Sequence, residues 1–234
     1  MSTGNRLVDA LSEPIGHRLR TYLQLTHLRA GRILVDAGDP IRHVYFPVGA
    51  LLALTAVTAD ADSLQVAAIG AEGCSAETLA AGMTVSPHRV IVQLAGGAYR
   101  VPVDVVRLEL LKNEAFRNAM IASVADLATQ CTESALCVAF HPLVRRLARW
   151  LLHARDHAHS STLEVTQDVV AQMLGVFRQR VSPALMELEA HSLIHQGVGR
   201  IHIVNRRGLQ ALACECYESR MRASAIAVRR TASD

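Results

Sequence analysis

The segment from Gln167 to Ile203 constrains the fold most, because its residues predict two helices and a hairpin in a fixed order. Thr166 can cap the first helix through its hydroxyl. A small residue is required where two helices cross, and Ala171 stands there. Gly175 suits a turn with a positive φ, and the aliphatic Val181 follows six residues later as a core position of a second helix. The spacing predicts a helix-turn-helix.

The start of the second helix is unusual, because three long polar side chains, Arg178, Gln179 and Arg180, precede an apolar sequence and Pro183 follows closely. A proline inside a helix costs about 3 kcal/mol. Two alternatives therefore stay open. The helix is distorted at Pro183, or it begins near Ser182 as the N-cap and leaves the polar trio on the turn. The segment SLIHQGVGRIHIV after this helix predicts two strands around a glycine turn, which form a wing.

The charge distribution supports a polyanionic partner for this region. Residues 139–234 carry a net charge of +5, whereas residues 1–138 carry −2. An arginine at a helix start can donate two hydrogen bonds to guanine, and a glutamine can pair with adenine. The alternative is that Arg178, Gln179 and Arg180 are simply solvated. We favour binding to double-stranded DNA, because three long polar residues occupy this place in a winged helix.

The pattern upstream changes twice along the chain. Residues 6–29 contain apolar residues at helical spacings and predict short helices. Residues 31–102 consist of short apolar or β-branched runs, and eight of the 14 glycines lie there. Many tight turns between short strands are typical of an antiparallel β-sandwich or β-roll. The sequence therefore predicts an α+β chain.

A long helix is predicted after Asp104, with small apolar residues that alternate at spacings of three and four. This pattern is typical of a helix that pairs with its copy in a second chain. The alternative is a helix that packs on its own β-domain. The predicted dimer interface consists of Ile121, Val124, Ala128, Cys131, Ala135 and Val138.

Catalytic and metal sites are not predicted. The chain lacks the fingerprints of serine hydrolases, zinc proteases, P-loop proteins and dinucleotide enzymes, so we expect no enzyme and no cofactor. His153, His157 and His159 are interpreted as part of a polar loop rather than as metal ligands. Cys214 and Cys216 are expected on one helix, where residues two apart do not face each other.

The compartment follows from the cysteines and the hydropathy. Five cysteines, an odd number without the spacing of a disulfide framework, indicate a reducing cytoplasm. No apolar run approaches the roughly 20 residues that a membrane-spanning helix needs, so no membrane partner is expected.

The sequence resembles a known family. VTQDVVAQMLGVFRQRVSPALMELEAHSLIHQGVGRIHIVNRRGL resembles the winged-helix domain of the Crp–Fnr regulators, and GRILVDAGDPIRHVYFPVGALLAL resembles the start of their cyclic-nucleotide-binding-like β-roll. The resemblance extends over residues 19–212. It implies that Arg178 reads a base and that Gln179 stands where glutamate is common. It also implies that Arg180 and Ser182 touch phosphate.

The resemblance further implies a degenerate effector pocket. The family binds a cyclic phosphate with backbone N–H groups after a glycine and with an arginine, and it binds the ribose with a carboxylate. Here Ala76 replaces the glycine, Glu77 can serve as the carboxylate, and Arg89 is shifted by about one position with no Ser or Thr after it. A slip of one residue in a strand turns a side chain to the other face. Cyclic AMP is therefore not expected as the effector. The iron–sulfur branch of the family has an N-terminal cysteine cluster, and this chain has no cysteine before Cys74.

We therefore predict a sensor domain at 1–112, a dimerisation helix at 113–138 and a winged-helix domain at 139–234. The expected function is sequence-specific regulation of transcription by a homodimer, with RNA polymerase as a candidate partner. The alternative is a ligand-binding or protein-interaction module of the same fold whose winged helix does not read DNA. The candidate DNA-binding residues are Thr166, Gln167, Arg178, Gln179, Arg180, Ser182 and Arg200.

Overall fold

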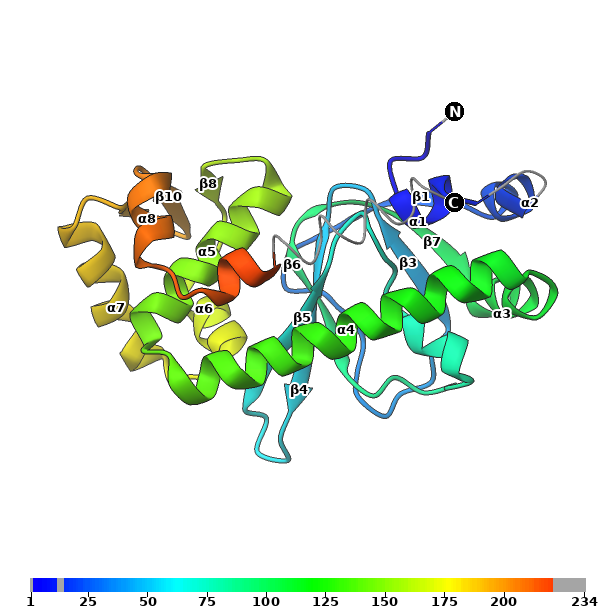
Figure 1. Cartoon of the computed structure of the whole chain (residues 1–234), viewed down its shortest axis with the longest axis horizontal. Helices are drawn as coiled ribbons and strands as arrows, with labels where there is room; N and C mark the ends of the chain where they lie inside the picture. Colours follow the sequence, from blue (N-terminus) through cyan, green and yellow to red (C-terminus); the bar gives the residue numbers. More distant parts are fainter. Residues whose placement is uncertain (1, 12–14, 221–234) are drawn as a thin grey trace. The chain divides into compact units, whose positions relative to one another are not determined.

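The structure is a computed structural model that describes residues 2–11 and 15–220. The chain forms two compact units, residues 1–131 and residues 132–234. The division falls inside α4 (Glu114–Phe140), a helix of 27 residues. Figure 1 labels most of the helices and strands of both units.

The first unit is built on two antiparallel sheets, as the short strands and glycine turns predict. One sheet has the order β1-β7-β3 and the other has the order β2-β6-β4-β5. The strands are β1 (Gln24–Leu28), β2 (Ile33–Val35), β3 (His43–Pro47), β4 (Leu51–Val57), β5 (Ser63–Ile69), β6 (Arg89–Leu94) and β7 (Gly96–Pro102). The strand β1 corrects the prediction of a helix up to residue 29, because residues 24–28 pair along β7 from Arg100 to Gly96. Pairing with a neighbouring strand has overridden the local helical spacing.

Short helices accompany the sheets of the first unit. They are α1 (Arg6–Asp9), α2 (Ile15–Thr21), the 3-10 helix η1 (Glu77–Ala81) and α3 (Val103–Lys112). Asn5 caps α1 by accepting a hydrogen bond from the Val8 N–H, and its amide nitrogen donates to the carbonyls of Pro47 and Gly73. These three bonds fix the start of α1 to the β-structure.

The first part of α4 packs on its own β-unit. Phe116 and Met120 are fully buried in one cluster, and Leu127 is buried in another cluster with strand residues such as Leu52. Gln130 accepts a hydrogen bond from the Ala68 N–H and donates one to the Ala68 carbonyl on β5. Figure 1 shows this part of α4 beside β4 and β5.

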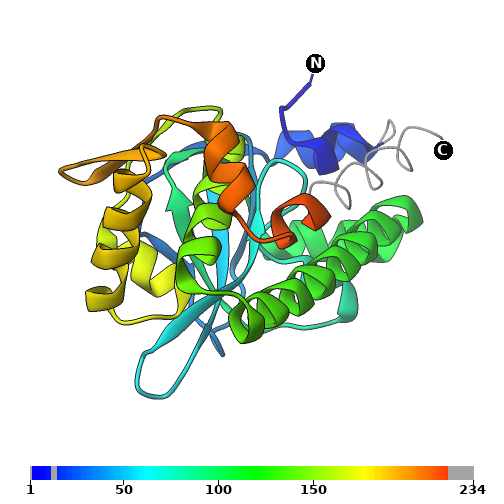
Figure 2. The ribbon, with the colours of Figure 1, turned by 60° about the vertical axis from the view of Figure 1, so that its left-hand side comes forward.

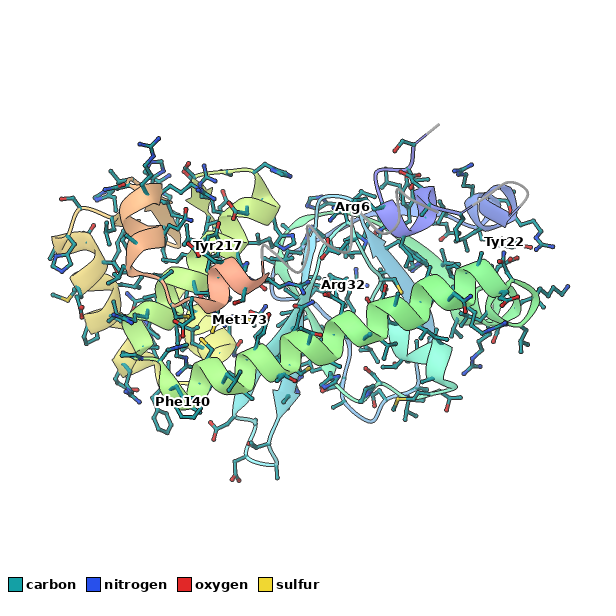
Figure 3. The ribbon with its side chains drawn as sticks, in the orientation of Figure 1. Arg6, Tyr22, Arg32, Phe140, Met173 and Tyr217 are labelled. Atoms are coloured by element: carbon teal, nitrogen blue, oxygen red, sulfur yellow. The ribbon has the colours of Figure 1, made fainter. Side chains whose placement is uncertain are left out.

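Another face of α4 carries the predicted interface, and it is exposed. Ile121 is 49% exposed and Val138 is 41% exposed, whereas Val124 and Cys131 are half-buried. Leu136 and Phe140 are also exposed, but they lie outside the predicted seam. Figure 3 shows Phe140 pointing outward at the end of α4. The helix therefore packs on its own unit through one set of residues and leaves the predicted dimer seam accessible.

The second unit contains the helical hairpin and the wing. After the end of α4 it consists of α5 (Leu143–Ala158), β8 (Thr162–Leu163), α6 (Gln167–Leu174), α7 (Arg178–Ala190), β9 (Ile194–Gly197), β10 (Arg200–Ile203) and α8 (Arg206–Leu212). The strands form one antiparallel sheet of order β8-β10-β9. Buried Leu147, Leu151 and Trp150 on α5 form part of its core.

The segment after α8 differs from the prediction of one continuous helix. The helix α8 ends at Leu212, where Ala213 takes the extended backbone angles φ −57° and ψ 154°. Helical structure begins again at Cys216 and reaches residue 220, the end of the described chain. Cys214 therefore lies in a bend and not on the helix that was expected to hold both cysteines. Among the described residues, no helix is long and apolar enough to cross a membrane.

Candidate nucleic-acid interface

The helical hairpin forms as its sequence predicts. The Thr166 hydroxyl accepts a hydrogen bond from the Val169 N–H and caps α6. Gly175 ends α6 with φ +62°, a conformation that costs a residue with a β-carbon about 1–2 kcal/mol. Ala171 and Val181 are buried between the two helices. Each residue that defines the helix-turn-helix pattern is confirmed in its structural role.

The recognition helix α7 begins directly with the polar trio. Phe177 is its N-cap and Arg178 is its first residue, so the alternative of a helix that starts near Ser182 is wrong. Pro183 lies inside the helix, on an exposed position of the second turn. Only the carbonyl of residue 179 loses its helical partner there, which keeps the disturbance local.

A buried arginine supports the hairpin from beneath. Arg146 on α5 is only 8% exposed, and its guanidinium donates a hydrogen bond to the Leu174 carbonyl at the last residue of α6. The C-terminal end of a helix carries a partial negative charge, which a cation stabilises. Burial lowers the pKa of Arg146 from its usual value. This contact ties the end of α6 to α5.

The candidate DNA-binding residues surround one concavity of about 320 Å³. Thr166 and Gln167 lie at the start of α6, Arg178 lies at the start of α7, and Arg200 lies on β10 of the wing. The floor includes buried apolar residues such as Leu185. The fold thus brings together four of the seven predicted residues from three elements.

The remaining three candidates lie on α7 itself. Gln179 and Arg180 are exposed and Ser182 is partly buried. Arg178 forms an ion pair with Asp168 at 3.3 Å, with the two side chains 65% and 58% exposed. Exposed ion pairs contribute about 0–1 kcal/mol. Arg178 can therefore exchange this partner for a nucleic-acid group at little cost.

The helix-turn-helix and the fold of the chain are both similar to those of known proteins. A family profile described as a Crp-like helix-turn-helix domain matches residues 145–212. The fold of the chain is similar to that of a transcriptional regulator of the crp/fnr family from Eubacterium rectale, with a TM-score of 0.69 and 14% identity over 90% of this chain and 99% of that one. Residues 145–212 therefore carry a Crp-like helix-turn-helix domain, and the chain has the fold of a crp/fnr-family regulator.

Two further solved structures have a similar fold. A CRP/FNR-family regulator from Thermus thermophilus has a TM-score of 0.67 and 19% identity, and the alignment covers 81% of this chain and 98% of that one. FixK2 from Bradyrhizobium japonicum has a TM-score of 0.67 and 15% identity, over 82% of this chain and 98% of its own. A search of curated protein sequences finds no match to the chain.

The wing, formed by β9 and β10, is a tight antiparallel hairpin. Gly199 has φ +65°, and Val198 at the tip is fully exposed. Glu189 on α7 accepts two hydrogen bonds from Gln196, one from its backbone N–H and one from its side-chain amide. These bonds lower the pKa of Glu189 and hold the wing to the end of the recognition helix. Figure 2 shows the hairpin projecting beside α7.

The two candidate effector residues of the β-unit, Arg89 and Glu77, both have partners within the protein. The Arg89 guanidinium donates two hydrogen bonds of 2.9 Å to the Asp36 carboxylate. Glu77 is only 3% exposed, and its carboxyl accepts a hydrogen bond from the Cys74 N–H. Burial raises the pKa of Glu77 to about 8. Glu77 is therefore a core residue that is protonated at neutral pH.

The histidines of the predicted loop lie on or beside α5. His153 is on the helix, where its ring stands 5.1 Å from the Tyr217 ring, and burial lowers its pKa well below the usual value. His159 ends α5 with φ +49°.

Another group of potential metal ligands comes together in the described part of the chain. It consists of Cys137, His141, Cys214 and Cys216. Sequence reasoning missed Cys137 and His141, because 77 residues separate Cys137 from Cys214.

Proposed function

We propose that this protein is a Crp–Fnr regulator that controls transcription as a homodimer, and that its α7 helices read base edges in duplex DNA. The fold and the Crp-like domain support DNA-binding regulation in general. The observation that carries the specific proposal is the first turn of α7, where Arg178, Gln179 and Arg180 are all exposed. A recognition helix meets the major groove with its N-terminal residues.

The proposed DNA contact of each residue follows from its position on α6, α7 or β10 and from the chemistry of its side chain. Arg178 and Gln179 contact bases, because a guanidinium and an amide each offer two hydrogen-bonding atoms in a plane. Arg180 and Ser182 lie further along the turn and contact phosphate. Thr166, Gln167 and Arg200 line the adjacent concavity and position the DNA backbone.

The proposed dimer forms through the exposed seam of α4. Ile121 and Val138 are large apolar residues with 49% and 41% of their surfaces accessible. The remaining positions, Val124, Ala128, Cys131 and Ala135, lie at the same alternating spacing of three and four. Two copies related by a two-fold axis would present two α7 helices to half-sites about one helical turn apart. We also propose that the protein acts in the cytoplasm and contacts RNA polymerase.

The β-unit is proposed not to bind a cyclic nucleotide. The charge of Arg89 is already neutralised by Asp36, and the carboxyl of Glu77 is buried. Ala76 has a β-carbon where close backbone approach would require glycine. Calorimetry with cyclic AMP and cyclic GMP tests this point. Micromolar binding that disappears in Arg89→Ala would overturn it.

The experiment for the main proposal is selection from random duplex DNA with the full chain, followed by binding titrations on the enriched site. Arg178→Ala should weaken binding to that site by about 1–3 kcal/mol and relax the preference at one base pair. Arg107→Ala is the control, because Arg107 lies on α3 of the β-unit. An absence of any enriched sequence would contradict base reading. An absence of salt-dependent duplex binding would favour the alternative, a ligand-binding or protein-interaction module.

A further inference from the structure

Four potential metal ligands converge within the second unit. Cys137 lies near the end of α4, His141 lies between α4 and α5, and Cys214 and Cys216 follow α8. One ligand atom from each residue lies within 4.8 Å of the other three. Three separate segments thus bring three thiols and one imidazole to a single point.

The distances match those of a tetrahedral metal centre. Zn²⁺ bonds of about 2.3 Å to sulfur and about 2.0–2.1 Å to nitrogen place two sulfur ligands about 3.8 Å apart and a sulfur and a nitrogen about 3.5–3.6 Å apart. The Sγ atoms of Cys137 and Cys214 are 3.5 Å apart. The Sγ of Cys216 is 3.6 Å from Nδ1 of His141. Both pairs therefore already lie close to the edges of such a tetrahedron.

The histidine is oriented as metal-bound histidines usually are. While Nδ1 of His141 faces Cys216, Nε2 lies 3.1 Å from the Glu215 carboxylate. A carboxylate that accepts the second ring N–H fixes the tautomer and leaves the other nitrogen unprotonated for the metal. Glu215 itself is exposed and lies between the two cysteines in the sequence. It therefore acts as a positioning residue outside the ligand set.

The surroundings favour a negatively charged centre. Cys137 and Cys214 are 0% and 1% exposed and Cys216 is 8% exposed, so the thiols are shielded from bulk solvent. Arg149 lies close by, and its Nε is buried without a hydrogen-bond partner among the described residues. Three thiolates and Zn²⁺ carry a net charge of −1, which this arginine would balance.

We propose that Cys137, His141, Cys214 and Cys216 bind one Zn²⁺ ion in a tetrahedral site with three sulfur ligands and one nitrogen ligand. This is one of the common ligand sets of structural zinc sites. A [2Fe–2S] cluster fits less well, because ligands at its opposite ends are separated by two iron atoms and lie farther apart than these four atoms do. A disulfide would use only two of the sulfurs and would leave His141 and Cys216 without a role.

The proposed ion would hold the last described segment of the chain against the start of the unit. The ligands from α4 and from the bend after α8 are 77 residues apart in sequence, and the Crp-like domain lies between them. A metal that joins them closes the unit at its two ends. The same site explains why α8 breaks at Ala213, because a continuous helix would separate the side chains of Cys214 and Cys216.

The test begins with the full chain, produced with Zn²⁺ in the growth medium and purified without chelators. Elemental analysis should find one zinc per chain. Cys216→Ser should lower this content several-fold, whereas Cys131→Ser, a control at a half-buried cysteine elsewhere on α4, should leave it unchanged. Glu215→Gln should retain the stoichiometry but weaken zinc affinity by about 10–100-fold in competition with a chromogenic chelator.

A second measurement does not depend on the folding of any variant. Co²⁺ replaces zinc in the wild-type chain, where tetrahedral thiolate ligation produces thiolate-to-cobalt charge-transfer bands and intense visible absorption. The proposal is overturned if the reduced wild-type chain takes up no stoichiometric Zn²⁺ or if Co²⁺ gives only the pale spectrum of an octahedral site. It is equally overturned if alkylation and mass spectrometry find Cys137 and Cys214 joined in a disulfide and the chain still binds no zinc after that bond has been reduced, or if Cys216→Ser folds and keeps its zinc.

Discussion

Glu77 provides a direct test of the electrostatics of the β-unit. Its carboxyl is 3% exposed, it lies close to Gly73, and burial raises its pKa from 4.5 to about 8. A β-carbon at Gly73 would stand 2.6 Å from the Glu77 Oε1 atom, so the packing here is tight. Glu77→Gln keeps the shape and the acceptor for the Cys74 N–H, but it removes the titration. We expect this variant to change how stability depends on pH.

The sign and the size follow from proton linkage. Between pH 4.5 and about 8 the folded state keeps the Glu77 proton, whereas the unfolded state releases it. The free energy of unfolding therefore falls as the pH rises through this window, at up to about 1.4 kcal/mol per pH unit. A folded-state pKa of about 8 corresponds to a total loss of about 5 kcal/mol across both titrations, as an order of magnitude. Between pH 5 and pH 8 the loss is about 3.5 kcal/mol, and the stability of Glu77→Gln relative to the wild type should rise by this amount.

The assay is urea unfolding at pH 5 and pH 8 at a fixed protein concentration, followed by circular dichroism. Trp150 is the single tryptophan and is buried in the second unit, so its fluorescence separately identifies the transition of that unit. Glu114→Gln is the control, because Glu114 is exposed at the start of α4. If the stability difference between wild type and Glu77→Gln were equal at the two pH values, Glu77 would not be protonated in the fold and the reasoning would be refuted.

Three further predictions concern the DNA-binding unit and the seam. Val124→Glu combined with Ala128→Glu should produce monomers in analytical ultracentrifugation. The control Ala122→Glu, on another face of α4, should leave the dimer intact. A double variant that still sediments as a dimer would place the interface elsewhere. Arg180→Ala should weaken all duplex sequences similarly and flatten the slope of log K against log salt by about one per protomer, measured by fluorescence anisotropy. Gly175→Ala should lower the unfolding free energy of the second unit by about 1 kcal/mol in tryptophan-detected urea titrations, because its φ is +62°; an unchanged midpoint would contradict the strain argument.

The sequence predicted the helical hairpin well because its determinants are local. Thr166, Gly175 and Val181 each act within a few residues of their own position, through a cap, a turn or a packed helix face. The β-unit was predicted for the same reason, since glycines and short β-branched runs define strands locally. These features depend little on distant parts of the chain.

The errors arose where distant contacts decide the structure. Residues 24–28 have helical spacing but form β1, because β7 offers a strand for them to pair with. The side chain of Glu77 enters the core, although its sequence context suggested a pocket. Pro183 allowed two helix starts, and only the structure shows that α7 begins at Arg178. Each outcome depends on neighbours that lie far away in the sequence.

The cysteine and histidine group illustrates the same limit more strongly. Cys214 and Cys216 were dismissed as ligands because a continuous helix would separate them, and that helix is interrupted. Cys137 lies in the predicted dimerisation helix, and no local pattern predicts a role for His141. Their convergence depends on the packing of the whole second unit, which no spacing rule contains.

The exposed apolar face of α4 has a consequence for the protein in the cell. Within the proposed seam, Ile121 is 49% exposed and Val138 is 41% exposed. In the proposed dimer these surfaces are removed from water, so the folded state is favoured by mass action as the protein becomes more abundant. The amount of the regulator would then set both its lifetime against proteolysis and its occupancy of a paired site. The concentration of the protein would then control DNA binding, even without a small-molecule effector.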